Sequence, residues 1–185
     1  MGQYFMPVNL DKRQFVDPHD YGSGLKLMEH SWLENGLVNA ILYLLRPGGN
    51  WHRNRIVWAG DYMDKGLFLK EFGKRAKDKT LYAFMDKSGA NASGKITPRI
   101  PDGPVLRYLI NHTLKEYVNL THLPADADGW CIHPLPLLTC SGNGHGGGDF
   151  NGENAFVERW AGTELSASYE PPENMTEIHP DFIEN

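Results

Sequence analysis

The chain has few cysteines and no long apolar segment, and each lack excludes a class of protein. Two cysteines in 185 residues, Cys131 and Cys140, cannot build the dense disulfide framework of a small secreted domain. The longest apolar run, residues 37–45, is far shorter than the roughly 20 residues that span a bilayer. The first residues lack the basic and then apolar segments of a signal peptide. We therefore expect a soluble, cytoplasmic protein with no membrane partner.

Basic residues are scarce in the second part of the chain. Residues 1–102 carry 15 Lys and Arg against 11 Asp and Glu, whereas residues 103–185 carry 3 against 12, so +4 and −9 give the net −5. Residues 170–185 hold five acidic residues and no basic one, which predicts a solubilising, partly disordered acidic tail. Without this tail the body is neutral, which argues against strong non-specific nucleic-acid binding.

Length and composition are those of one globular domain, with 41% hydrophobic and 22% charged residues. Within it, two segments match when the chain is shifted by 102 residues. Asn9 after Val8 falls on Asn111 after Ile110, and residues 58–60 fall on 160–162, both Trp-Ala-Gly. The matches predict an internal duplication with halves 1–100 and 105–169. Chance similarity of two common strand patterns is the alternative.

Turn and periodicity signals give the elements of each half. Asn9 and Asn111 end apolar runs and suit tight reversals, so each predicts a β-hairpin. Further strands are expected at residues 55–60 and 156–162 and a strand-like run at 135–139, with helices at 37–46 and 67–77 and a linker at 86–104. The expected fold class is α+β with mostly antiparallel strands, arranged as two pseudo-repeated hairpin-plus-strand halves with a few helices.

Five segments together resemble a group of bacterial and phage proteins whose activity is not characterised. They are MGQY (residues 1–4), VNLDK (8–12), GLKLME (24–29), WAGDY (58–62) and SGNGHGGGD (141–149). In that group the glycine-rich stretch tends to precede a Trp-Ala-Gly-Asp strand, and here Thr163 stands in place of Asp. The resemblance implies a bacterial cell, or a phage gene, as the setting and implies no activity.

The glycine-rich loop is the first candidate binding element. Residues 142–147 fit the pattern G-x-G-x-x-G, but no helix start follows, as a dinucleotide site requires, and the Walker Gly-Lys-Ser/Thr is missing. Bare glycine amides can still form an anion-binding nest. A flexible loop whose glycines serve turns alone is the alternative. The candidate ligand-binding residues here are Asn143, Gly144, His145, Gly146, Gly147 and Asp149.

The second candidate element is the basic loop Arg46–Arg55. It offers Arg46, Arg53 and Arg55 for a phosphate and Trp51 for a stacked base. Under the duplication this loop matches the glycine-rich loop, so the two are expected to line one composite cleft. Asp149 would repel a phosphate, and it is therefore expected at a sugar, base or cation position, or folded back onto loop amides.

Metal and catalytic patterns are weaker. Cys131, His133, Cys140 and His145 are zinc-ligand types at an uncommon spacing, and the calcium-loop pattern after Asp149 fails, so no cofactor is expected. The sequence favours a non-enzymatic binding protein for a phosphorylated, nucleotide-like ligand, which would suit a phage accessory or counter-defence factor. The alternatives are a small hydrolase of such a ligand, using Asp61, Asp64, Asp149 or His145, and a module that binds a protein partner.

Overall fold

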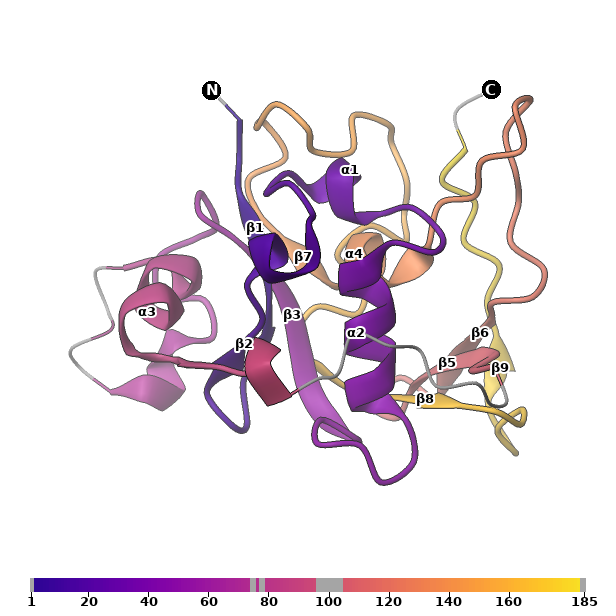
Figure 1. Cartoon of the computed structure of the whole chain (residues 1–185), viewed down its shortest axis with the longest axis horizontal. Coiled ribbons are helices and arrows are strands. Elements are labelled where there is room, and N and C mark those ends of the chain that lie inside the picture. Colours follow the sequence, from indigo (N-terminus) through magenta and orange to yellow (C-terminus); the bar gives the residue numbers. More distant parts are fainter. Residues whose placement is uncertain (1, 74–75, 77–78, 96–104, 184–185) are drawn as a thin grey trace.

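The protein is an α+β fold built on one open, mixed and mostly antiparallel sheet (Figure 1). The structure, a computed structural model, describes residues 2–73, 76, 79–95 and 105–183. Within these residues the nine strands are β1 (Phe5–Asn9), β2 (Gln14–Phe15), β3 (Asn54–Gly60), β4 (Ala90–Asn91), β5 (Tyr108–Asn111), β6 (Glu116–Asn119), β7 (Cys140–Ser141), β8 (Thr163–Ser168) and β9 (Thr176–Glu177). The four α-helices are α1 (Leu27–His30), α2 (Gly36–Leu45), α3 (Leu81–Ser88) and α4 (Pro134–Thr139).

Both predicted hairpins are confirmed, and the two turns are built alike. The Asn9 Oδ1 accepts from the Lys12 amide at 2.9 Å, and the Asn111 Oδ1 accepts from the Leu114 amide at 2.9 Å. Each turn then ends on a residue with positive φ, 52° at Arg13 and 58° at Lys115. The Asn side chains hold the reversals that their sequence positions predicted.

The strands on the two sides of the sheet correspond in type: counted from either edge, there is a short parallel strand, then the second and the first strand of a hairpin, and then a central strand. The order is β4-β2-β1-β3-β8-β5-β6-β9, and β7 pairs with β3 outside this path. The central strands β3 and β8 are antiparallel, with Arg55 opposite Glu164. Each central strand also accepts one hydrogen bond from its neighbouring hairpin: the Leu10 amide donates to the Arg55 carbonyl of β3 at 3.0 Å, and the His112 amide donates to the Glu164 carbonyl of β8 at 2.9 Å. The four strands on each side of the β3–β8 pairing thus follow the same order, and β7 has no counterpart beside β8 among the described residues.

The expected match of the two Trp-Ala-Gly segments is wrong. Trp58 lies within β3, whereas Trp160 lies in the turn before β8. The residue placed like Trp160 is Trp51, because each indole Nε1–H donates at 2.8 Å to the first residue of the second hairpin strand, Gln14 and Glu116 respectively. The predicted strand at residues 156–162 is accordingly a turn, and β8 starts at residue 163.

The sheet has an apolar layer on each face, and successive residues of β3 alternate between them. Ile56 and Trp58 join a large core with α2 and α4, while Val57 and Ala59 join a smaller core with α3. Figure 1 shows α3 on one side of β1 and β3, and α2 with α4 on the other. The predicted helix at 37–46 is confirmed as α2, whose first amides are capped by the Asn35 side chain.

Three other expected elements are corrected. Of the helix predicted at 67–77, the described residues 67–73 form a short 3₁₀-helix, Leu69–Phe72, followed by Gly73 at φ 89°, while residues 74, 75 and 77 lie outside the described part. The run at 135–139 is not a strand but helix α4, because Pro134 fixes a helical φ at its first turn and His133 caps it. The predicted linker begins too early, since α3 continues to Ser88 and Ala90–Asn91 form β4; residues 96–104 lie outside the described part.

The acidic tail is packed rather than loose up to residue 183. Strand β9 pairs in parallel with β6, and Phe182 is 2% exposed in the main core. The pairing of β9 and the burial of Phe182 explain why the acidic composition is compatible with a packed segment up to residue 183. Among the described residues, no helix has the length and apolar character needed to cross a membrane.

Candidate functional site

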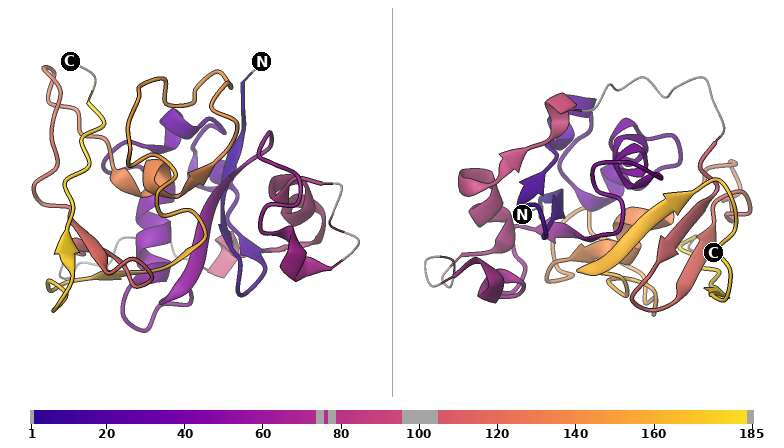
Figure 2. Two further views of the ribbon diagram at one scale, coloured as in Figure 1. Left: turned by 180° about the vertical axis from the view of Figure 1, so that it is seen from behind. Right: turned by 90° about the horizontal axis from the view of Figure 1, so that it is seen from below.

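The two candidate loops lie at opposite ends of β3, so they do not share a cleft (Figures 1 and 2). The basic loop ends where β3 begins. Strand β7 runs parallel to β3 beside Trp58 and Ala59, so the glycine-rich loop after it leaves at the carboxyl end of β3. The prediction of one composite cleft is wrong because the length of a strand separates its two walls.

The side chains of the basic loop already have protein partners. Arg53 Nε donates to Glu164 at 2.6 Å. Arg55 donates to Asp11 and Glu71 at 2.6–2.8 Å, and these bonds raise the pKa of its guanidinium. The Arg46 guanidinium lies over the Tyr43 ring.

Trp51, the expected stacking residue, is 0% exposed and bonded to Gln14. The structure therefore does not bring Arg46, Trp51, Arg53 and Arg55 together as a phosphate and base site.

The glycine-rich loop is held against the N-terminal strand and α1. A Cβ at Gly146 would lie 2.1 Å from the Gln3 Cβ, so only glycine fits this close approach. Gly147 bridges Gly2, and the Gly148 carbonyl accepts from the Met28 amide at 3.0 Å. Asn143, Gly144 and His145 at the tip are exposed. The glycines thus serve close packing as well as turns.

Asp149 is the unusual member of this loop. It is 4% exposed, and its Oδ2 accepts from the Gly146 amide at 3.0 Å, which is the folded-back position expected as one alternative. Its Oδ1 is buried and has no hydrogen-bond partner within the described ranges. Burial is the main cause that raises the pKa of this carboxyl, and the Gly146 amide opposes the shift. A buried carboxylate with a free oxygen is costly unless it serves a ligand or a partner.

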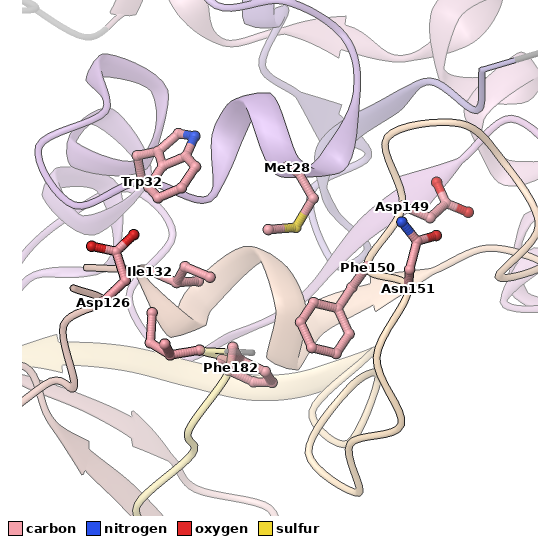
Figure 3. A pocket seen from close by; sticks show the side chains of 9 residues that line it. Met28, Trp32, Asp126, Ile132, Asp149, Phe150, Asn151 and Phe182 are labelled. Carbon is pink, nitrogen blue, oxygen red and sulfur yellow. The ribbon is translucent and has the colours of Figure 1, made fainter. Parts of the chain in front are cut away.

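A pocket of about 220 Å³ lies beside Asp149. It is formed where four segments meet: α1 with the residues after it, the stretch before α4, the glycine-rich loop and the C-terminal segment (Figure 3). Its lining residues are Met28, Trp32, Asp126, Ile132, Asp149, Phe150, Asn151, Phe182 and Ile183. Sequence reasoning named only Asp149 among them, because the others come from segments that no local motif connects.

The pocket is apolar in its middle and acidic at its two ends. Figure 3 shows Asp126 at one end and Asp149 at the other, with Ile132, Phe150 and Phe182 between them. The Asp126 Oδ1 accepts from the Trp130 amide at 2.8 Å, which fixes this carboxylate beside the pocket. Its nine lining residues include no Lys, Arg or His. The walls therefore favour a positively charged group.

The zinc-type residues do not group into a metal centre, whereas two of the candidate acid/base residues lie near Asp149: besides burial, Asp61 raises the pKa of its carboxyl and His145 lowers it. His133 is buried and its Nδ1 accepts from the Leu135 amide, while Cys140 Sγ donates to the Leu137 carbonyl. Asp61 Oδ1 accepts from the Tyr4 amide at 2.9 Å, and Asp64 is exposed. Over the part of the chain that the structure describes, no three His, Cys, Asp or Glu residues are grouped to hold a metal ion.

Comparison with protein-family models, with curated proteins and with solved structures found no match to this chain. The functional conclusion therefore depends on the geometry of the pocket.

Proposed function

We propose that this protein is a non-enzymatic binding protein whose pocket between α1, the glycine-rich loop and the C-terminal segment takes one ammonium or guanidinium group. The observation that carries the proposal is the lining of that pocket, two carboxylates and several apolar side chains with no basic residue. This keeps the class expected from the sequence, a binding protein, and changes the charge of its ligand.

Aromatic walls and carboxylates together suit a cation with an apolar stem. Trp32, Phe150 and Phe182 line the pocket, and ring faces attract cations by about 0.5–2 kcal/mol. The half-buried Asp126 carboxylate supplies the opposite charge at one end of the pocket, and the charge of Asp149, whose Oδ1 is buried, acts on the cation through space where water is partly excluded. The pocket volume of about 220 Å³ lies below the roughly 300–1,000 Å³ of drug-sized sites. A side chain of the lysine type suits that volume.

A phosphorylated ligand has weaker support. The three arginines of the basic loop are engaged by Glu164, by Asp11 with Glu71, and by Tyr43. At the glycine-rich loop, backbone amides and the Lys26 side chain that lies against Gly148 remain for an anion, and Asp149 accepts from one of those amides. Metal-assisted hydrolysis has no support, because no three His, Cys, Asp or Glu residues are grouped to hold a metal ion within the described segments.

Calorimetric titration with capped lysine (Nα-acetyl-lysine methylamide), with capped norleucine as its uncharged analogue, tests the proposal. We expect capped lysine to bind, capped norleucine to bind at least about tenfold more weakly, and affinity to fall as salt screens the carboxylates. Asp126→Asn and Asp149→Asn should each weaken binding. Both keep an acceptor oxygen for the backbone amides that these residues now hold.

Asp128→Asn is the matched control, because Asp128 is exposed in the same turn as Asp126 and does not line the pocket. It should leave affinity unchanged. Absence of binding to the wild type, or binding of mono- or dinucleotides in place of the amine, would show that the assigned ligand charge is wrong.

The two halves of the sheet also support the internal duplication, which we propose as the origin of the fold. The strand order, the paired hairpin turns and the Trp51–Gln14 and Trp160–Glu116 bonds recur in both halves. The register differs from the one expected, since the equivalent tryptophans are 109 rather than 102 residues apart. Tolerance of Gln at position 116 tests this equivalence.

A further inference from the structure

Trp130 is the largest apolar side chain beside the pocket that remains in contact with solvent. It is 60% exposed and meets Trp32, a pocket residue, edge to face with ring centroids 5.6 Å apart. Its amide bonds to Asp126, the carboxylate at one end of the pocket. The pocket thus continues into an exposed aromatic surface that a small amine would leave uncovered.

The backbone places Trp130 on the pocket side. Trp32 and Ile132 form an antiparallel bridge, and both line the pocket. Trp130 is two positions from Ile132, and side chains two positions apart in extended chain share a face. Leu33, which is 41% exposed, follows Trp32 in a turn and does not line the pocket. Two exposed apolar residues beside one bridge therefore differ in their relation to the pocket.

The charge around this surface indicates the partner. Asp128, Glu153 and Asp181 are each within two residues of a lining residue and are exposed. The whole segment 103–185 carries 3 basic against 12 acidic residues. A basic partner is complementary to this negative charge. Tryptophan is also among the residue types that contribute most of the binding energy in protein interfaces.

We propose that the ligand is a basic segment of another polypeptide, which inserts one Lys or Arg side chain into the pocket and packs a neighbouring apolar side chain on Trp130. This inference rests on the proposed function and names its partner class. Trp130 then contributes to peptide affinity only, while Asp149 contributes to the binding of any amine.

The test compares a capped heptapeptide of alternating lysine and leucine with capped lysine, by calorimetry on four proteins. On the wild type the peptide should bind at least about tenfold more tightly than capped lysine. Trp130→Ala should lose most of that gain and bind capped lysine as the wild type does. Leu33→Ala should keep the gain, and Asp149→Asn should weaken both ligands.

Each result decides between the two proposals. Equal peptide affinity in Trp130→Ala and wild type, with capped lysine still bound, overturns the peptide inference alone. No binding of capped lysine to the wild type overturns the cation pocket itself. The same peptide with glutamate in place of lysine should not bind; if it binds as tightly, charge complementarity is the wrong basis. A purely apolar docking surface would give that outcome.

Discussion

Each half of the sheet contains a hydrogen-bonded pair that we call its brace, Trp51–Gln14 in the first half and Trp160–Glu116 in the second. The halves differ in the segment that connects the helix to the central strand. In each half a fully buried indole donates to a polar side chain that begins the second hairpin strand. In the first half, eight residues connect α2 to β3, and their charged side chains are paired. In the second half, 23 residues connect α4 to β8, and this connection contains Asp149 with its unpartnered oxygen.

This difference distinguishes the residues that stabilise the sheet from those that line the pocket. Three buried side-chain atoms lack a hydrogen-bond partner in the described structure, Gln3 Nε2, His133 Nε2 and Asp149 Oδ1, and among them Asp149 alone belongs to a residue that lines the pocket. The longer connection also supplies Phe150 and Asn151 to the pocket. Substitutions in the shared brace should therefore cost stability, and substitutions in the added segment should cost binding.

The largest expected effect is loss of either brace tryptophan. Trp51→Ala and Trp160→Ala should each lower the free energy of unfolding by about 3–5 kcal/mol, because both indoles are fully buried and a cavity remains. Urea denaturation measures the change. Trp130→Ala, at an exposed position, should stay within about 0.5 kcal/mol of the wild type. A small effect at Trp51 with a large one at Trp160 would break the equivalence of the halves.

The next effect is acid destabilisation by one histidine from each half. Burial lowers the pKa of His30 to about 4 and that of His133 to about 3, from 6.5. Both are neutral in the folded state and take up protons on unfolding below pH 6.5. Each therefore contributes stability that is complete above pH 6.5 and is lost, at about 1.4 kcal/mol per pH unit, as pH falls toward its folded pKa.

Unfolding free energies from pH 7 to pH 4.5 check this slope. His133→Asn keeps a cap for α4 and removes one titrating group, so its slope should be lower than the wild type by one proton. His30→Gln should lower the slope similarly. Asp149 acts with the opposite sign because its pKa is raised, so each variant is compared with the wild type at the same pH. Unchanged slopes would mean that the imidazoles are hydrated.

A smaller effect tests the brace acceptors. Glu116 accepts from both the Trp160 indole and the Arg159 guanidinium, which hold the pKa of its carboxyl below the usual value. Glu116→Ala leaves the buried indole N–H unsatisfied and should cost about 1–3 kcal/mol. Glu116→Gln reproduces the acceptor found at Gln14 and should cost about 1 kcal/mol or less, because Arg159 is largely exposed. Equal losses for Ala and Gln would argue against the duplication.

Local signals predicted the parts of the fold that local interactions build. The hairpins at Asn9 and Asn111 follow from Asx-turn chemistry, and α2 follows from its apolar periodicity and its cap at Asn35. The run at 135–139 is too short for its periodicity to separate strand from helix. Its cap, a histidine, is outside the usual set, although Pro134 at the first helical position was an available signal.

The site was predictable only in part, because it depends on contacts between distant segments. Asp149 stood out as a carboxylate among glycines, and its folded-back position was one expected alternative. Trp51 was misjudged since an indole in a basic loop suits stacking as well as a core. Phe182 was hidden by the charge of its neighbours, yet it is a buried wall of the pocket. The overall composition of a segment does not show which single apolar residue packs into the core.

The smallest expected change has the most direct bearing on the difference between the halves. Asp149→Asn, which should weaken amine binding, should also raise the free energy of unfolding by up to about 1 kcal/mol, since it removes a buried charge and keeps the acceptor for Gly146. Because the folded pKa of this carboxyl is raised above 3.8, the ionised form is disfavoured in the folded state. The gain should therefore be full at neutral pH and should fade as pH falls through the ordinary Asp pKa of about 3.9, well below which Asp149 is protonated whether folded or not. Urea denaturation at about pH 7 and about pH 3 measures both limits. Arg53→Ala in the opposite loop is the control, because it breaks an exposed ion pair with Glu164 and should give no such gain. A loss of stability at pH 7 would mean that Asp149 is part of the scaffold after all, and the contrast between the paired basic loop of the first half and the pocket-lining connection of the second would fail at the residue on which it depends.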